Sequence, residues 1–198
     1  MTGPDYFDRV YADAADPWRL ASSAYEHRKY AATLAALDRD RYGRVFEPGC
    51  SVGVLTAMLA ERTDDLVAWD RSAVAVEQAR VRAPGATVSV GVVPGEWPSG
   101  RFDLVVLSEL VYYLDHHARA RVLEQLVGCL AEGGEVLAVH WVHPFEEAET
   151  DGPTVHRELR AVAGLEPVVH RDDPDYELDL LRLTRGGGPA ASGRPSPG

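Results

Sequence analysis

The chain has 198 residues, 45% of them hydrophobic and 26% charged, a composition typical of globular proteins. This length suits one α/β domain with a sizeable core. A formal net charge of -11 disfavours nucleic acid and anionic membranes as partners, because both bind best to positive surfaces. No apolar run reaches the roughly 20 residues of a membrane helix, and the first residues lack the pattern of a signal peptide. Cys50 and Cys129 form no metal-type pair, so we expect a cytoplasmic protein without a metal site.

The first 40 residues predict a lid segment followed by one helix. Tyr6, Phe7, Tyr11 and Trp18 are too many aromatic residues for a plain disordered tail, so this segment either closes over a pocket or only covers the core. Ser23 with a glutamate three residues later has the pattern of a capping box, which predicts a helix running to about residue 38.

From residue 44 onward, short apolar runs alternate with helical patterns. Runs rich in β-branched residues predict strands at 44–47, 66–69, 88–93, 102–107 and 135–142, and apolar spacing predicts helices at 54–62, 72–82 and 117–130. Asp115 is the expected N-cap of the last of these helices, and Gly133 and Gly134 are its expected end. Strands that alternate with helices indicate a parallel sheet with helices on both faces.

The C-terminal part predicts a different connection. A helix at 155–163 precedes two strands at 166–171 and 176–184, and the turn at 172–175 is too short for a parallel crossover, so these strands should be antiparallel. The expected fold is therefore an α/β, Rossmann-like three-layer sandwich, with a mostly parallel seven-stranded sheet and an antiparallel C-terminal strand. We expect it to occupy residues 41–185, with residues 186–198, rich in Gly, Pro and Ser, as a disordered tail.

The segment 45–53, VFEPGCSVG, carries the strongest functional signal. A strand runs into a small-residue turn that opens a helix, and glycines there let a ligand approach the backbone and the free N–H groups of the helix. A dinucleotide-binding loop reads G-x-G-x-x-G, whereas Glu47 disfavours a phosphate and can accept a bond from a ligand ammonium group. Asp70 ends the next strand, where a carboxylate either accepts from ribose hydroxyls or caps the helix that begins near Ser72.

Glu47, Gly49, Ser51 and Gly53 match the acid-x-Gly-x-Gly-x-Gly loop of class I S-adenosylmethionine (SAM)-dependent methyltransferases, except that Ser51 replaces the middle glycine. Further segments at 16–18, 25–26, 29–30, 47–50, 102–109 and 112–114 resemble the nodulation (NodS-like) N-methyltransferase family over most of residues 5–185. This resemblance implies SAM as cofactor, covered by the aromatic N-terminal segment and the helix after it. The adenine should meet backbone groups after the third strand, because the acid that many relatives carry there is missing. The expected cofactor-binding residues are Trp18, Arg28, Tyr30, Glu47, Gly49, Cys50, Ser51, Gly53, Asp70, Arg71, Val92, Val93 and Ser108.

Side chains that follow the fourth and fifth strands are candidates for the acceptor site, because ligands of open α/β sheets lie beyond the carboxyl ends of the strands. Glu109 is expected to bind and deprotonate an amine and Tyr112 to orient it; a solvated helix cap and mere packing are the alternatives. His140 is the alternate base, and a hydrogen-bonded residue at the rim of the pocket is the other interpretation of this position. The acidic segment 145–153 is expected to be a mobile loop over the pocket. The expected substrate contacts are Tyr6, Tyr11, Tyr113, Trp141 and His143.

These features predict a methyltransferase that acts on a small molecule, with N-methylation of an amino sugar or a specialised-metabolite intermediate as the leading hypothesis. A hydroxyl or carboxylate acceptor stays open, with His140 or His143 as the base. A SAM-binding module without catalysis also stays open, although the strand-end set of Glu109, Tyr112 and His140 counts against it. A nicotinamide-dependent reductase fits less well, because G-x-G-x-x-G is absent and the terminal hairpin does not suit that fold.

Overall fold

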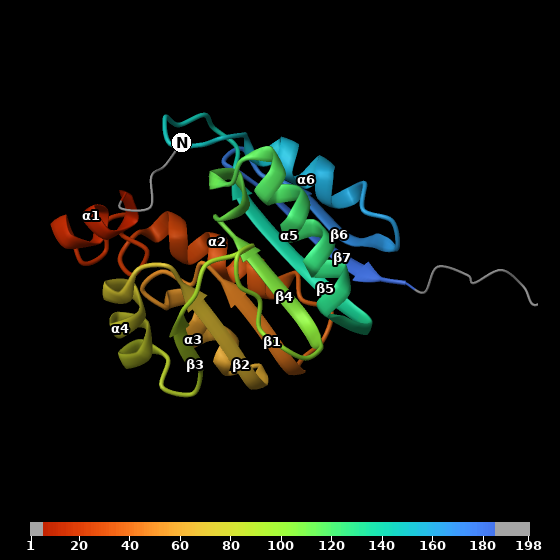
Figure 1. Cartoon of the computed structure of the whole chain (residues 1–198), viewed down its shortest axis with the longest axis horizontal. Helices are drawn as coiled ribbons and strands as arrows, with labels where there is room; N and C mark the ends of the chain where they lie inside the picture. The colour runs from red at the N-terminus through yellow and green to blue at the C-terminus, as the bar shows by residue number, and fades with distance from the viewer. Residues whose placement is uncertain (1–5, 185–198) are drawn as a thin grey trace, which may run out of the picture.

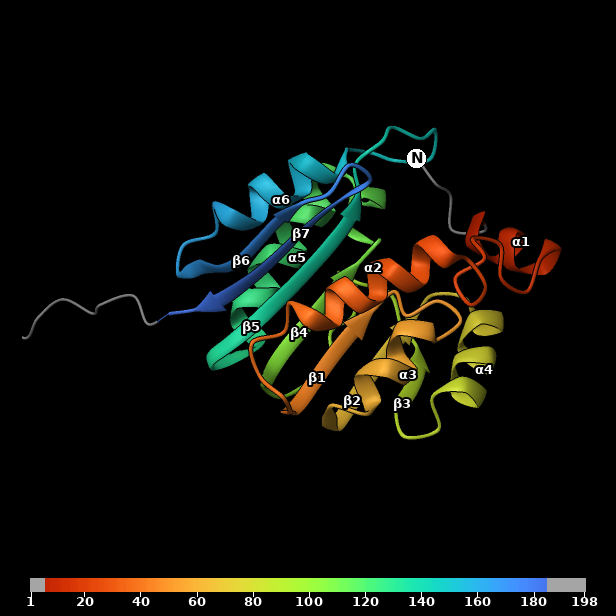
Figure 2. The same ribbon diagram turned by 180° about the vertical axis from the view of Figure 1, so that it is seen from behind.

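The computed structural model describes residues 6–184, in which seven strands form one twisted sheet with helices on both faces (Figures 1 and 2). The strands are β1 (Tyr42–Pro48), β2 (Thr63–Asp70), β3 (Thr87–Val90), β4 (Phe102–Ser108), β5 (Leu130–Trp141), β6 (Leu165–Asp172) and β7 (Tyr176–Leu183). The helices are α1 (Tyr6–Asp13), α2 (Ala24–Ala35), α3 (Val54–Ala60), α4 (Ala73–Arg82), α5 (His116–Cys129) and α6 (Gly152–Arg160), with a short 3-10 helix η1 (Val111–Tyr113). The tail predicted at 186–198 and the first five residues of the predicted lid lie outside the described residues.

The strands lie in the order β3-β2-β1-β4-β5-β7-β6. All neighbouring pairs up to β5 are parallel, while β7 runs antiparallel to both β5 and β6. The three-residue turn between β6 and β7 makes this a hairpin, as the shortness of the connection predicts. The predicted fold class, a mostly parallel seven-stranded Rossmann-like sheet with one antiparallel C-terminal strand, is confirmed.

Alternation along the central strands builds a separate core on each face of the sheet. Val45 packs in one core cluster with Leu55 of α3, whereas Phe46 packs in the other with Val122 of α5. Because successive side chains of a strand point to opposite faces, one strand supplies both cores. Figures 1 and 2 show α5 and α6 over one face and α2 and α3 over the other.

The predicted end of helix α5 is wrong. The helix ends at Cys129, and the chain enters β5 at Leu130, so Gly133 and Gly134 lie inside a strand. Gly133 has a positive φ of 68°, and a Cβ on Gly134 would lie 2.9 Å from the carbonyl oxygen of Phe102. The glycines therefore serve a close approach of β5 to β4, where the register shifts. Asp115 does cap α5, because its Oδ1 accepts from Ala118 N at 2.8 Å.

Other elements also differ from the predicted ones. The third strand stops at Val90 instead of residue 93, so the expected adenine contacts follow it in a turn. Helix α6 begins at Gly152, three residues early, because Asp151 accepts from Thr154 N at 2.7 Å and a proline occupies the first turn. Residues Tyr6–Asp13 form a helix, α1, that the aromatic pattern alone does not reveal.

Only one of the two hydrogen bonds of the predicted capping box forms at the start of α2. Ser23 Oγ accepts from Glu26 N at 3.4 Å, but Ser23 N donates to Arg19 O, and the Glu26 carboxylate turns along the helix to Lys29. Glu26 therefore pairs with Lys29 and not with the backbone of Ser23.

Within residues 6–184, no helix has the length and apolar character to cross a membrane.

Candidate active site

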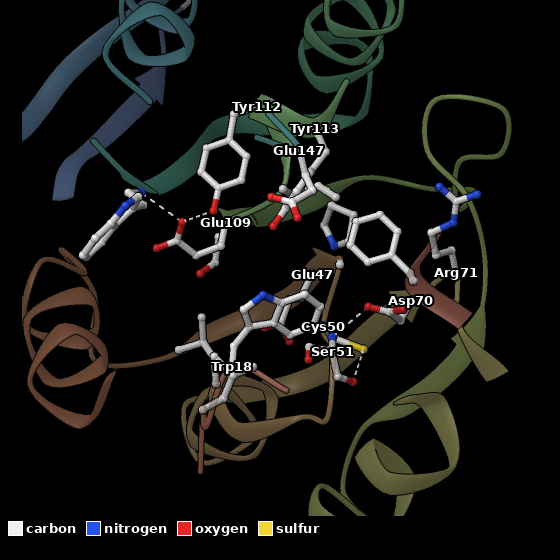
Figure 3. Close-up of a pocket in the computed structure, with 18 of the residues that line it drawn as sticks. Trp18, Glu47, Cys50, Ser51, Asp70, Arg71, Glu109, Tyr112, Tyr113 and Glu147 are labelled. Carbon is white, nitrogen blue, oxygen red and sulfur yellow. Dashed lines mark hydrogen bonds between the residues drawn. The ribbon is translucent and has the colours of Figure 1, made fainter. Parts of the chain in front are cut away.

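A cavity of about 720 Å³ opens at the carboxyl ends of β1, β2 and β4, beneath α1 and α2 (Figure 3). This is the place where open α/β sheets bind ligands. Of the residues predicted for the site, most line this cavity: Tyr6, Tyr11, Trp18, Tyr30, Glu47, Gly49, Cys50, Ser51, Asp70, Arg71, Val92, Val93, Ser108, Glu109, Tyr112, Tyr113 and Trp141. Arg28, Gly53, His140 and His143 do not.

The loop after β1 forms the floor of one end of the cavity. Gly49 and Ser51 have positive φ angles of 76° and 50°, and the N–H groups of Gly49 and Cys50 donate to Trp69 O of β2 at 2.7 and 2.9 Å. Leu110 lies against Gly49, where a Cβ would come within 3.1 Å of its side chain. The loop is therefore held in a tight turn that exposes backbone to the cavity.

Gly53 does not line the cavity, and its visible role is in packing. It caps α3 with a φ of 78°, and a Cβ there would lie 2.7 Å from Ala79 Cα of α4. A side chain at this position would push α3 and α4 apart, so the last glycine of the motif sets a helix–helix approach.

Asp70 is buried at the end of β2 and accepts hydrogen bonds from two backbone N–H groups. Its Oδ1 accepts from Ser72 N at the start of α4, and its Oδ2 accepts from Ser51 N, each at 2.9 Å. The carboxylate thus fixes the β1 loop and the backbone of Ser72, the N-cap residue of α4, while it still lines the cavity. Each carboxylate oxygen has a second lone pair, so acceptor capacity remains for a ligand hydroxyl.

Glu47 is a buried acid at the same end. Its side chain is 2% exposed, and burial raises its pKa to about 8. Its Oε2 has no hydrogen-bond partner within the described residues, although buried polar atoms are nearly always paired. An unpaired carboxylate oxygen at the wall of a cavity calls for a ligand donor, and a cationic one fits it best.

Helix α1 covers the mouth of the cavity and touches both of its ends. Tyr11 OH and Ser51 Oγ lie 2.6 Å apart, which ties α1 to the β1 loop. Tyr6 OH donates to Glu147 at 3.1 Å, and the Phe7 ring meets the Tyr113 ring edge-on at 5.2 Å. The N-terminal segment therefore lies where a lid would lie, and it contacts the acidic segment that follows β5.

Glu109 is the centre of a hydrogen-bonded cluster at the other end of the cavity (Figure 3). Lys29 Nζ lies 2.6 Å from its Oε1, Trp141 N donates to Oε2 at 2.9 Å, and Tyr112 OH donates to the same oxygen. Lys29 also pairs with Glu26 at 3.0 Å. Burial alone lowers the pKa of Lys29, but the charges of Glu109 and Glu26 outweigh it and raise that pKa above its ordinary value.

The sequence reasoning missed Lys29 and Glu26 as parts of the site. Lys29 is the only lysine of the chain, it is 3% exposed, and it lies three residues after Glu26 on one face of α2. The three-residue spacing from Glu26 and the absence of any other lysine were the sequence signals that could have identified Lys29. The contact with Glu109, 80 residues away, depends on how α2 lies over the sheet.

His140 does not reach the cavity. It is fully buried behind η1, where its Nε2 accepts from Val111 N at 3.3 Å, and burial lowers its pKa well below the ordinary value. A neutral ring enclosed in this way has no path to an acceptor proton, so the geometry does not support His140 as a base. His140 is a hydrogen-bonded residue, as the other interpretation of its position expected, but it lies in the core and not at the rim of the cavity.

Two other predicted residues lie outside the cavity. Arg28 is on the exposed face of α2, and the His143 ring is exposed and lies 3.0 Å from Asp175. Position 28 turns away because Lys29 and Tyr30, its neighbours on the helix, occupy the buried face.

Comparison with known proteins identifies the family of the chain. The family model "Nodulation protein S (NodS)" matches residues 5–140. The chain belongs to the NodS family. Nodulation protein S of Bradyrhizobium diazoefficiens is 34% identical over 121 residues, which cover 57% of this chain and 57% of that protein. A trans-aconitate 2-methyltransferase of Methylobacterium nodulans is 32% identical over 161 residues, 80% of this chain and 58% of the relative. The chain thus spans little more than half the length of the curated relatives that it matches.

Solved structures share the fold over most of this chain. A putative methyltransferase from Pseudomonas syringae is 41% identical, with a TM-score of 0.72, over 81% of this chain and 99% of that one. The N-methyltransferase NodS from Bradyrhizobium japonicum WM9, in complex with S-adenosyl-L-homocysteine (SAH), has a TM-score of 0.75 at 22% identity, over 89% of this chain and 95% of that one. This NodS-like chain therefore has the fold of both proteins.

Proposed function

We propose that this NodS-family protein is a SAM-dependent methyltransferase that methylates an amine of a small molecule. The observation that carries the proposal is a single cavity with two chemically distinct ends. One end is a glycine-containing loop with two buried acids, and the other is a carboxylate cluster surrounded by aromatic rings. SAM supplies an activated methyl group on a sulfonium centre, so the protein has mainly to bind and align the acceptor.

The first end suits SAM. The unpaired Oε2 of Glu47 is available to the ammonium group of the methionine part, and Asp70 to the ribose hydroxyls. Val92 and Val93 follow β3 at the cavity wall, in the position expected for adenine. Trp18 and α1 would cover the bound molecule. The match of these carboxylate acceptors to a cationic, amine-bearing nucleoside supports the proposed cofactor.

The charge of the cavity supports an amine over a carboxylate acceptor. Among the described residues that line it, the acids are Glu26, Glu47, Asp70, Glu109, Asp115, Glu147 and Glu149, and the bases are Lys29 and Arg71. Lys29 is already bound between two of these carboxylates. A cavity of this sign attracts a cationic amine and repels a carboxylate such as trans-aconitate.

Glu109 and Tyr112 are the residues that we expect to handle the acceptor. Lys29, Trp141 N and Tyr112 fix the Glu109 carboxylate, so its charge is available to attract an amine in a defined place. The Tyr112 hydroxyl donates to Glu109, so its oxygen can also act as an acceptor for an N–H of the methyl acceptor. Binding and orientation of the amine are the roles that this arrangement supports best, since three donors already occupy the carboxylate.

Matched acceptor pairs test the proposal. Purified protein would be incubated with SAM and glucosamine, spermidine or phenylethylamine, with N-acetylglucosamine and trans-aconitate as acceptors that lack a basic amine. Mass spectrometry would detect the methylated product and SAH. We expect methylation only of basic amines. Methylation of trans-aconitate alone would contradict the amine assignment, and SAM binding without any product would favour a binding module.

A further inference from the structure

A chain of buried hydrogen bonds lies behind the acceptor end and takes no direct part in the proposed chemistry. Val111 N donates to His140 Nε2 at 3.3 Å, His140 Nδ1 lies 3.2 Å from His156 Nε2, and His156 Nδ1 lies 2.7 Å from Asp179 Oδ2. The three side chains are fully buried. They come from β5, α6 and β7, so the chain connects the antiparallel edge of the sheet with η1.

One proton arrangement satisfies all three bonds. A backbone N–H can only donate, so the Nε2 atom of His140 must be bare, and its neutral ring carries the proton on Nδ1. That proton is donated to His156 Nε2, which must be bare in turn, and His156 therefore donates from Nδ1 to Asp179. The far end agrees, because an ionised carboxylate only accepts.

The surroundings of Asp179 favour its ionised form. Arg160 Nη1 and His170 Nδ1 lie 2.6 and 2.7 Å from its two oxygens. Burial raises the pKa of Asp179, but the bonds from His156 and His170 and the charge of Arg160 bring the pKa below its ordinary value. Arg160 also pairs with Glu177 at 2.6 Å, so its guanidinium group lies between the carboxylates of Asp179 and Glu177.

The near end of the chain is the turn that carries the acceptor site. Val111 is the first residue of η1, and the next residue, Tyr112, lines the cavity and donates to Glu109. The Tyr112 ring also packs edge-on against the His140 ring at 5.2 Å. A change in the orientation of His140 would therefore act on the backbone of the turn and on the tyrosine ring together.

We propose that His140 and His156 are positioning residues for the acceptor, which hold η1 through the Val111 N–H so that Tyr112 keeps its place on Glu109. Asp179 anchors the chain by fixing the ring of His156. The functional part of this inference rests on the proposed methyl transfer, while its structural part does not.

Two substitutions at one position separate the two bonds of His140. The carbonyl oxygen of Gln reaches the place of Nε2 and can accept from Val111, whereas Asn reproduces only the Nδ1 side and cannot reach the turn. Hydrogen exchange of the Val111 amide is the direct readout. We expect Val111 protection in His140→Gln close to that of the parent protein, and a loss of about tenfold or more in His140→Asn.

Kinetics then distinguish positioning from general stability. We expect His140→Asn to raise the KM for the amine about tenfold, with little change in the Kd for SAH, and His140→Gln to restore most of that loss. Val122→Ala on α5 is the control for destabilisation alone. Val122 is buried in the core cluster that holds Val111 and Tyr112, but it takes no part in the chain of hydrogen bonds. If the His140 variants do not fold, His156→Gln and His156→Met test the bond between His140 and His156 in the same way. Of these two side chains only Gln can accept from His140 Nδ1.

Equal Val111 protection in the Gln and Asn variants would overturn the positioning role. So would amine KM values that follow thermal stability alone across these variants and Val122→Ala. If the parent protein transfers no methyl group to any amine, the proposed function fails, and the Val111 exchange pattern still decides whether the chain holds the turn.

Discussion

Glu109 adopts a positive φ of 52°, an unusual conformation for a glutamate, and it holds that conformation at the centre of the acceptor cluster. Strained residues of this kind are concentrated at functional sites, where the surrounding contacts impose the conformation. Here the contacts are those with Lys29, Tyr112 and Trp141 N.

The charge of Glu109 is expected to be needed for the acceptor and not for the cofactor. Glu109→Gln should lower kcat/KM for the amine by at least about tenfold, roughly 1.4 kcal/mol, and leave the Kd for SAH within about twofold. Steady-state kinetics and calorimetry measure the two effects, with the exposed Glu124→Gln on α5 as control. A smaller loss of kcat/KM would remove Glu109 from the mechanism.

Ser51 stands where the family motif has a glycine, and its hydroxyl contacts Tyr11 of α1. Ser51→Gly should relieve the positive φ of this residue, a stabilisation of about 1 kcal/mol before the greater chain entropy of glycine is subtracted. Ser51→Ala keeps the strained backbone. Both variants lose the bond to Tyr11, so hydrogen exchange in residues 6–13 should become faster in both. Unchanged exchange would show that this bond does not hold α1 over the cavity.

Burial of Glu47 makes the stability of the cofactor-free protein depend on pH. Its pKa rises from an ordinary 4.5 to about 8 on folding, so the folded state binds more protons than the unfolded state between these values. The free energy of unfolding should therefore fall as pH rises through this window, with a slope of at most about 1.4 kcal/mol per pH unit from this group. Urea unfolding of Glu47→Gln should lack this contribution. Parallel pH profiles for the two proteins would contradict it.

Helix α2 contributes Lys29 to the site through the way it packs over the strand ends. Its single lysine lies between two carboxylates, one on α2 itself and one after β4. Lys29→Met would leave Glu26 and Glu109 facing each other without a cation, and should destabilise the protein by about 3 kcal/mol. Adding Glu26→Gln should recover part of this loss in urea unfolding. If the double variant is no more stable than Lys29→Met, the repulsion between these carboxylates is not what destabilises it.

The order of the seven strands was predictable, because short apolar runs mark the strands and alternate with helical spacing. The β1 loop and Asp70 were also predictable from their positions at strand ends. The extent of β5 was not, because a pair of glycines ends a helix or marks a bulge with equal ease in sequence. His140 was misplaced for a related reason. Its strand-end position indicates the cavity, but the pleat directs its side chain into the core under η1.

At the scale of the molecule, the site joins segments that are distant along the chain. Helices α1 and α2 come from the first 35 residues, the glycine-containing loop follows β1, and the Glu109 cluster joins residues after β4 with Trp141 at the end of β5. Sequence patterns locate each segment separately, whereas the packing of α2 across the strand ends determines that Lys29 meets Glu109. The net charge of -11 is distributed so that the cavity itself is acidic, which suits a sulfonium cofactor and a cationic acceptor.

The most direct measurement is calorimetric titration of SAM and SAH into the purified protein, its Asp70→Ala variant and Asp64→Ala. Asp64 is an exposed acid at the opposite end of the same strand, so it controls for loss of charge. We expect micromolar binding to the parent protein and to Asp64→Ala, and binding at least about tenfold weaker to Asp70→Ala. Absence of binding to the parent protein, or equal binding to all three, would contradict a SAM site at the ends of β1 and β2.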